Sequence, residues 1–161
     1  MAYKDGEVKI FRIDPLDPIL GPLFPFLMQR MLDFAKIHFD ELDPEAQVRD
    51  YAMRAMGKDQ NLLIQAFIAP TGKLIGHAVS YIQEHGSKVW LYVAQCKVDE
   101  PAGDLIPRAI AEGEAFARDR GARKIIMVTR RSDSAWAKAY GFKTVRHMMN
   151  RDIENGKGDA V

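Results

Sequence analysis

The chain has 161 residues, 47% hydrophobic and 28% charged, which is enough for one globular domain with a substantial core. Its formal net charge of +1 excludes a bulk attraction to nucleic acid or to an acidic membrane. The single cysteine, Cys96, excludes an intramolecular disulfide and a cysteine-based metal cluster, and no metal site is predicted. No apolar signal region opens the sequence and no apolar run reaches the roughly 20 residues that span a bilayer, so we expect a cytoplasmic protein.

The first part of the chain predicts one strand and two helices. Alternating apolar and basic residues over 8–13 indicate a short strand, and four prolines between 15 and 25 prevent it from continuing. From Phe24 to Phe39 apolar residues recur at three- and four-residue steps, which predicts a helix with a wide apolar face. This face either packs in the core or contacts a partner. An Asp-Pro pair starts a second helix over 44–56.

Three runs rich in β-branched and aromatic residues follow, over 61–69, 74–82 and 88–98. Short turns join them, so they predict an antiparallel meander. The first turn is the tight Pro-Thr-Gly-Lys sequence at 70–73, and the second lies around Gly86.

A crossover unit comes next, with a helix over 104–120, a strand over 124–129 and a short helix. A strand, a helix and a second strand in this order require a parallel strand pair. A last strand is expected over 143–153. Residues 1–153 therefore predict a single α/β (α+β) domain with a mixed sheet of about six to seven strands and about four helices. Residues 154–161 predict a mobile tail.

Two motifs in this unit resemble the GNAT superfamily of acetyl-CoA-dependent N-acetyltransferases. Ala117-Arg-Asp-Arg-Gly-Ala-Arg-Lys-Ile-Ile-Met-Val-Thr129 is similar to the superfamily's helix end, glycine stop and following strand. Ala135-Trp-Ala-Lys-Ala-Tyr-Gly-Phe-Lys143 resembles its short helix that ends in a Gly-Phe pair. The order of elements over 8–153 is similar as well. The resemblance implies a parallel strand pair splayed at a cofactor cleft, where an amine attacks the thioester of acetyl-CoA directly.

The resemblance also implies how acetyl-CoA would bind. The pantetheine arm would pair with the backbone at the end of the 88–98 strand. The pyrophosphate would lie on amides at the start of the following helix, where free N–H groups and the helix dipole stabilise an anion. Two arginines directly after the 124–129 strand could hold phosphates or an acidic substrate, or could be ordinary solvated side chains. The cofactor-binding candidates are Cys96, Lys97, Val98, Gly103, Asp104, Arg108, Arg130 and Arg131.

The loop before this helix departs from the superfamily's phosphate-binding pattern of one basic and two small positions. Pro101 stands near the basic position, Asp104 and Ile106 stand near the small ones, and Gly103 is about one residue out of step. Pro101 and Pro107 have no N–H to donate to a phosphate. If Asp104 caps the helix, its carboxylate occupies the amides that a phosphate would use. These departures weaken the case for coenzyme A.

Three residues are candidates for the chemistry. Gln95 and Glu100, at the end of the central strand, could orient or deprotonate an amine, and Tyr140 could protonate the thiolate. The superfamily often places this tyrosine four residues before the glycine, where the chain has Ala137, so a packed Tyr140 is the alternative. Cys96 has no histidine near it in sequence and is interpreted as a small buried hydrophobe.

Two functions from different classes remain. The first is an acyl-CoA-dependent N-acyltransferase that acts on a small-molecule or protein amine. The second is a catalytically inactive GNAT-like binding or structural module, acting on a protein partner or a second copy through the Phe24 to Phe39 helix. Compact domains of this kind also resemble ones encoded by phage genomes. A nucleic-acid partner is not expected, because the basic cluster over 118–131 contains no interleaved aromatic residues.

Overall fold

A computed structural model describes residues 3–39, 42–128 and 138–144. The chain divides into two compact units, Met1–Val128 and Thr129–Val161. In the second unit the described residues begin with one helical turn over 138–140. The predicted closing strand over 143–153 lies almost entirely outside the described residues, and the tail over 154–161 lies wholly outside them.

The first unit contains a five-stranded mixed sheet. The strands follow the order β1-β2-β3-β4-β5, with antiparallel pairing up to β4 and a parallel β4–β5 pair. This confirms the predicted meander and the parallel pair. In chain order the elements are β1 (Lys9–Arg12), the 3-10 turn η1 (Gly21–Leu23), α1 (Phe24–His38), α2 (Pro44–Met56), β2 (Leu62–Ile68), β3 (Leu74–His85), β4 (Lys88–Val98), α3 (Leu105–Asp119) and β5 (Lys124–Met127).

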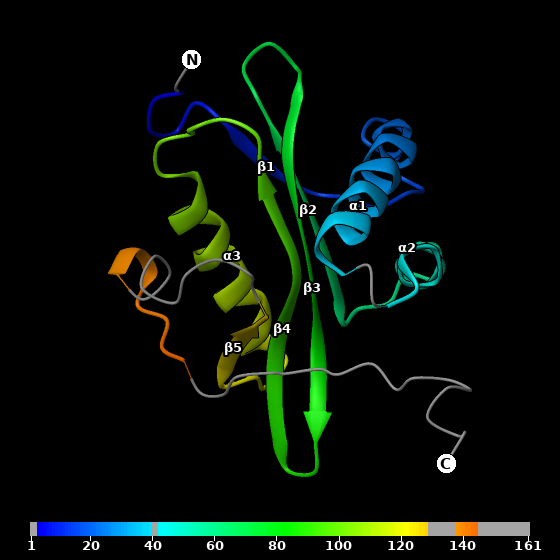
Figure 1. Cartoon of the computed structure of the whole chain (residues 1–161), viewed down its shortest axis with the longest axis vertical. Coiled ribbons are helices and arrows are strands. Elements are labelled where there is room, and N and C mark those ends of the chain that lie inside the picture. The colour runs from blue at the N-terminus through cyan, green and yellow to red at the C-terminus, as the bar shows by residue number, and fades with distance from the viewer. Residues whose placement is uncertain (1–2, 40–41, 129–137, 145–161) are drawn as a thin grey trace, which may run out of the picture. The chain divides into compact units, whose positions relative to one another are not determined.

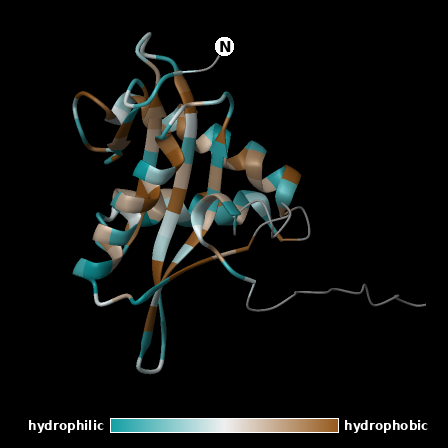
Figure 2. Cartoon of the chain, turned by 90° about the vertical axis from the view of Figure 1, so that its left-hand side faces the viewer, coloured by the Kyte–Doolittle hydropathy of each residue, from teal (hydrophilic) through white to brown (hydrophobic). Residues whose placement is uncertain are grey.

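Helices cover both faces of this sheet. Helices α1 and α2 lie on one face and α3 lies on the other (Figure 1). Both hydrophilic and hydrophobic segments alternate along the helices, as expected when one side of a helix meets a sheet and the other meets water (Figure 2). Within the described ranges, none of the helices is both long and apolar enough to cross a bilayer.

The start of α2 follows from its sequence. The Asp43 carboxylate accepts a hydrogen bond from the backbone N–H of Ala46 at 3.0 Å, so it caps the helix. Pro44 then occupies the first turn, where a missing N–H costs nothing. Gly57 ends the helix.

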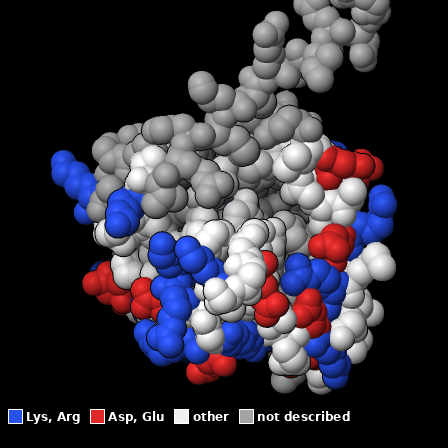
Figure 3. Space-filling model, turned by 90° about the horizontal axis from the view of Figure 1, so that it is seen from below, with Lys and Arg blue, Asp and Glu red and all other residues white. Residues whose placement is uncertain are grey.

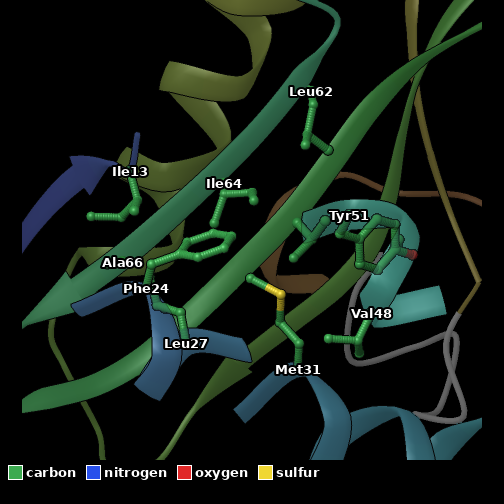
Figure 4. Packing of buried hydrophobic residues seen from close by; sticks show 11 residues of the cluster. Ile13, Phe24, Leu27, Met31, Val48, Tyr51, Leu62, Ile64 and Ala66 are labelled. Carbon is green, nitrogen blue, oxygen red and sulfur yellow. The ribbon is translucent and has the colours of Figure 1, made fainter. Parts of the chain in front are cut away.

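The largest single cluster of buried hydrophobic residues lies between the sheet and helices α1 and α2. Side chains of α1 and α2 point toward the strands there (Figure 4). Met31 and Leu27 are fully buried, so the middle of the wide apolar face of α1 is core. Phe26 and Ile37, at its margins, are 66% exposed. The buried residues of this cluster are Ile13, Phe24, Leu27, Met31, Val48, Tyr51, Leu62, Ile64, Ala66, Val79 and Ala94.

The pairing of β3 shifts register once with each of its two neighbouring strands. The β2–β3 register shifts between Phe67 and Ile68, and Gly76 lies beside this shift. A Cβ at Gly76 would lie 2.4 Å from the Lys97 carbonyl oxygen, so only glycine fits. The β3–β4 register shifts at Ala94, which has no partner on β3 in the ladder. This bulge places Ala94 and its neighbour Gln95 on the α1 face together.

Candidate functional site

Strands β4 and β5 pair over only part of the length of β4. Their parallel register runs from Trp90 with Lys124 to Val93 with Met127. Strand β4 then continues to Val98 and stays paired with β3. The bulge at Ala94 comes directly after the last β5 pair. Strand β5 ends at Met127, so beyond the bulge the side of β4 that faces away from β3 has no strand partner within the described residues.

Two contacts define the direction of the backbone N–H and C=O groups at the end of β4. The Asp99 N–H donates to the Ile75 carbonyl at 2.9 Å, and the Lys97 carbonyl lies against Gly76. Both groups therefore point toward β3. Because backbone groups alternate in direction along a strand, the N–H and C=O of Val98 point to the opposite edge.

The loop between β4 and α3 is held by the N-terminal segment, residues 3–7. The Tyr3 N–H donates to the Pro101 carbonyl at 2.9 Å. Gly103 has φ +57°, and a Cβ there would lie 2.6 Å from Asp5 Oδ1 and 2.9 Å from the carbonyl carbon of Lys4. Packing against the N-terminal segment thus requires a glycine at this position.

Asp104 is the residue before the first turn of α3, but its carboxylate does not cap the helix. It accepts hydrogen bonds from the Gly6 N–H and from Arg108 Nε, each at 2.9 Å. The bond from Gly6, followed by Arg108, lowers the pKa of Asp104. The Asp104 carboxylate therefore does not occupy the first-turn amides of α3, as it would if it capped the helix. The second donor of Arg108 binds the Val8 carbonyl at 2.7 Å.

A pocket of about 180 Å³ opens on the α1 face, where β3 and β4 meet α1. All of its lining residues belong to the first unit. Four of them carry formal charges, two positive and two negative. The lining residues are Arg30, Asp33, Phe34, Ile37, His38, His77, Lys97 and Asp99. We call this space the α1 pocket.

A hydrogen-bonded chain fixes the tautomer of His77 in the α1 pocket. Gln95 Nε2 donates to the Met31 carbonyl at 3.1 Å, so Gln95 Oε1 faces His77. The distance from His77 Nε2 to this oxygen is 2.8 Å. An amide oxygen only accepts, so Nε2 carries the ring proton and Nδ1 is an acceptor. Nδ1 is buried and has no hydrogen-bond partner among the described residues.

Burial lowers the pKa of His77 to about 4, and the hydrogen bond with Gln95 opposes this shift. The ring is therefore neutral at physiological pH. It is a poor base for an amine, since an α-amino group has a pKa of about 8 and the gap of about 4 units corresponds to about 5 kcal/mol. His77 can accept a hydrogen bond, but its basicity is too low to take the proton.

The lining of the α1 pocket includes an ion pair. Arg30 Nη1 and Nη2 donate to the two carboxylate oxygens of Asp99, each at 2.9 Å. This bidentate pair lowers the pKa of Asp99, with the hydrogen bond from Arg30 as the main cause. Arg30 Nε is buried and lacks an acceptor in the part of the chain that the structure describes. Within that same part, no carboxylate lies within ion-pair distance of Lys97.

Two of the predicted catalytic residues, Gln95 and Glu100, lie in the first unit and have different partners there. Gln95 is 2% exposed and both ends of its amide are bonded, so it positions His77. The Glu100 carboxylate lies 3.7 Å from the Lys73 ammonium. Tyr140 belongs to the second unit and is 36% exposed.

The predicted cofactor contacts that the structure describes lie in two parts of the first unit, strand β4 and the loop that leads into α3 together with the first turn of that helix. Cys96 pairs with Ala78 in the ladder and packs on the α3 face, opposite to His77. Gly103, Asp104 and Arg108 contact the N-terminal segment and Val8, the residue before β1, as described above. The two arginines at 130 and 131 lie outside the described residues. No group of three or more His, Cys, Asp or Glu side chains within the described ranges could hold a metal ion.

Sequence reasoning missed the α1 pocket. Its key residues, Arg30, His77 and Asp99, come from three separate elements, and no short motif joins them. One available signal was a histidine inside an apolar strand, where a buried polar group needs a partner. Positive and negative side chains are intermixed on the face seen in Figure 3, so charge clustering gave no further signal.

This architecture is the fold of solved acetyltransferase structures. An antiparallel meander is continued by a parallel strand, and β4 carries a bulge where it leaves β5. Helices α1 and α2 cover one face and α3 covers the other. The chain has this fold, as its similarity to solved acetyltransferase structures also shows.

No protein-family model and no curated protein matches the sequence. Solved structures match over nearly the whole chain. A predicted acetyltransferase with acetyl-CoA from Clostridium acetobutylicum has TM-score 0.64 and 15% identity, with 90% of this chain and 96% of that one covered. Glucosamine-6-phosphate N-acetyltransferase from Arabidopsis thaliana has TM-score 0.62 and 11% identity, with 91% and 99% covered. An aminoglycoside acetyltransferase from an uncultured soil metagenomic sample, in complex with trehalose, has TM-score 0.58 and 16% identity, with 95% and 99% covered.

Proposed function

We propose that the protein is an acyl-CoA-dependent N-acyltransferase of the cytoplasm. The observation that carries the proposal is the free edge of β4 beyond Val93: within the described residues β5 ends at Met127, while β4 stays paired with β3 as far as Val98. An extended pantetheine arm carries amide groups that can pair with such a strand edge. The neighbouring structures include one with acetyl-CoA, which supports this choice of cofactor.

In this reaction the nitrogen of a neutral amine forms a bond to the thioester carbonyl carbon. The carbon–sulfur bond then breaks, the thiolate leaves and takes up a proton, and the amine loses one. Backbone N–H groups near the bulge of β4 are the proposed donors to the developing oxyanion. Glu100 is the candidate base and Tyr140 the candidate acid, with Gln95 holding the adjacent wall of the site in place.

One observation favours the second candidate, a binding module that no longer uses coenzyme A. Pro101 and Asp104 stand in the loop between β4 and α3, so this loop offers one amide fewer and one negative charge more than a phosphate would need. Such a module would act through the exposed margins of α1, where Phe26 and Ile37 are found. Acetyl-CoA binding separates the two candidates.

The test is a calorimetric titration of the full chain with acetyl-CoA at low salt. Desulfo-CoA and adenosine 3′,5′-bisphosphate serve as control ligands. Dissociation constants in the micromolar range, about −8 kcal/mol, would support the acyltransferase and justify a screen of amines by thiol release. No heat up to millimolar acetyl-CoA would refute it and would favour the binding module.

A matched pair of variants tests the proposed pantetheine edge. Val98→Pro removes an N–H that points away from β3, and proline is tolerated at such an edge. Val98→Ala keeps this N–H and changes the side chain only. We expect acetyl-CoA to bind more weakly to Val98→Pro than to Val98→Ala, with similar urea midpoints. Equal affinities would remove this edge from the site.

A further inference from the structure

We infer that the α1 pocket binds a small zwitterionic amino acid, with its carboxylate at Arg30 Nε and the Lys97 ammonium and its own ammonium group donating to His77 Nδ1. This inference goes beyond acyl transfer, because the α1 pocket would bind such a ligand with or without coenzyme A. It rests on two buried atoms without partners, on the charges that surround them and on the size of the space.

The two buried atoms have opposite hydrogen-bonding roles. His77 Nδ1 can only accept, since the ring proton lies on Nε2. Arg30 Nε can only donate, and its two terminal nitrogens already bind Asp99. Both atoms are buried and lack partners within the described residues. Buried polar atoms without a hydrogen-bond partner are rare in folded proteins. A ligand that carries both an acceptor and a donor satisfies the two together.

The charges that line the α1 pocket favour a ligand that carries one positive and one negative charge. Arg30 and Lys97 contribute two positive charges to the lining and Asp33 and Asp99 contribute two negative ones, so the formal charge of the α1 pocket is balanced. A simple carboxylate or a simple amine would unbalance it, whereas a zwitterion would not. Lys97 is the cation without a carboxylate partner in the described ranges, so it is the side chain best able to meet the ligand's carboxylate.

The size of the α1 pocket and its apolar walls determine which amino acid side chain fits. A cavity of about 150 Å³ holds a benzene molecule in other proteins, so the 180 Å³ of the α1 pocket admits a small or medium amino acid. Phe34 and Ile37 supply the apolar walls. The Phe34 ring meets the His77 ring edge-on, at 5.9 Å between centroids. These walls favour an aliphatic side chain over a charged one.

The probes are L-alanine, L-valine and L-leucine, titrated into the full-length ¹⁵N-labelled chain without coenzyme A. Two truncated analogues of leucine, leucinol and 4-methylpentanoate, lack the carboxylate and the amine respectively. We expect saturable shifts of the His77 ring nitrogens and of the Arg30 Nε–H with at least one amino acid. We also expect at least tenfold weaker binding of both analogues. Failure of all three amino acids up to about 10 mM, or equal binding of an analogue, would overturn the inference.

A matched pair of lysine variants locates the site. Lys97→Met removes the unpaired cation from an exposed position and should weaken amino acid binding about tenfold. Lys88→Met makes the same change at the other end of β4, also at an exposed position, and should leave binding unchanged. Equal losses in both variants, or no loss in either, would contradict the assignment. Because acetyl-CoA is absent from this assay, its outcome is independent of the test of acyl transfer.

Discussion

Acid should destabilise the protein through His77. Burial lowers the pKa of His77 from 6.5 to about 4, so between these values the unfolded chain binds a proton that the folded chain excludes. Stability therefore falls as the pH drops from 6.5 toward 4. The full loss is about 3 kcal/mol, from about 2.5 pKa units at about 1.4 kcal/mol each, and most of it is reached by about pH 4.5. Urea unfolding at about pH 7.5 and 4.5, followed by circular dichroism, measures it.

A pair of histidine variants assigns this loss. His77→Gln removes the titrating ring and keeps an amide that can donate to Gln95, so most of the pH-dependent loss should disappear. His85→Gln changes an exposed histidine at the end of the β3–β4 hairpin and should keep the wild-type loss. Asp99 does not contribute to the loss of stability between pH 7.5 and 4.5, because its pKa is lowered from 3.8 and it stays charged over this range. The same pH dependence in His77→Gln as in the wild type would refute the reasoning.

Four further substitutions test the core, the loop and a cap. Met31→Glu places a charge at a fully buried position and should cost more than about 4 kcal/mol in urea unfolding, whereas Phe26→Glu at a 66% exposed position should cost less than about 1 kcal/mol. Gly103→Ala should cost about 2 kcal/mol, because φ +57° is strained for alanine and its Cβ meets Asp5, and hydrogen exchange of residues 3–7 should accelerate. Asp43→Ala should cost about 1 kcal/mol by the loss of the bond to the α2 amide, and little loss would mean that solvent replaces it.

Regular elements were predictable because their signals are local. The bounds of β4 match the predicted 88–98, since turn residues at its start and an Asp-Glu-Pro sequence at its end interrupt the apolar run. The bounds of α2 match the predicted 44–56 for the same kind of reason, an N-cap followed by proline and a glycine at the end. The crossover helix and the parallel strand after it also required only the order of elements.

The α1 pocket was not predictable because it depends on one irregularity and on distant pairs. Counting back from the end of the β3–β4 hairpin would pair His77 with Cys96 across the strands. The bulge at Ala94 shifts the partner of His77 to Lys97 instead. No turn signal marks a bulge in the middle of a strand. The contact of Gln95 with the Met31 carbonyl then joins residues 64 positions apart in the chain.

The structure changes what the loop between β4 and α3 implies about function. Sequence alone interprets Asp104 as a competitor for the amides that a phosphate would use. Its carboxylate instead accepts hydrogen bonds from the Gly6 N–H and from Arg108. Gly103 is required because the N-terminal segment packs against it. Both residues thus have roles in holding residues 3–7, and neither role requires the loss of the cofactor. What remains against a phosphate is the missing N–H of Pro101 and of Pro107 and the charge of the half-buried Asp104 carboxylate. Salt screens such a charge over about 8 Å at physiological ionic strength, so the loop should weaken coenzyme A binding without excluding it.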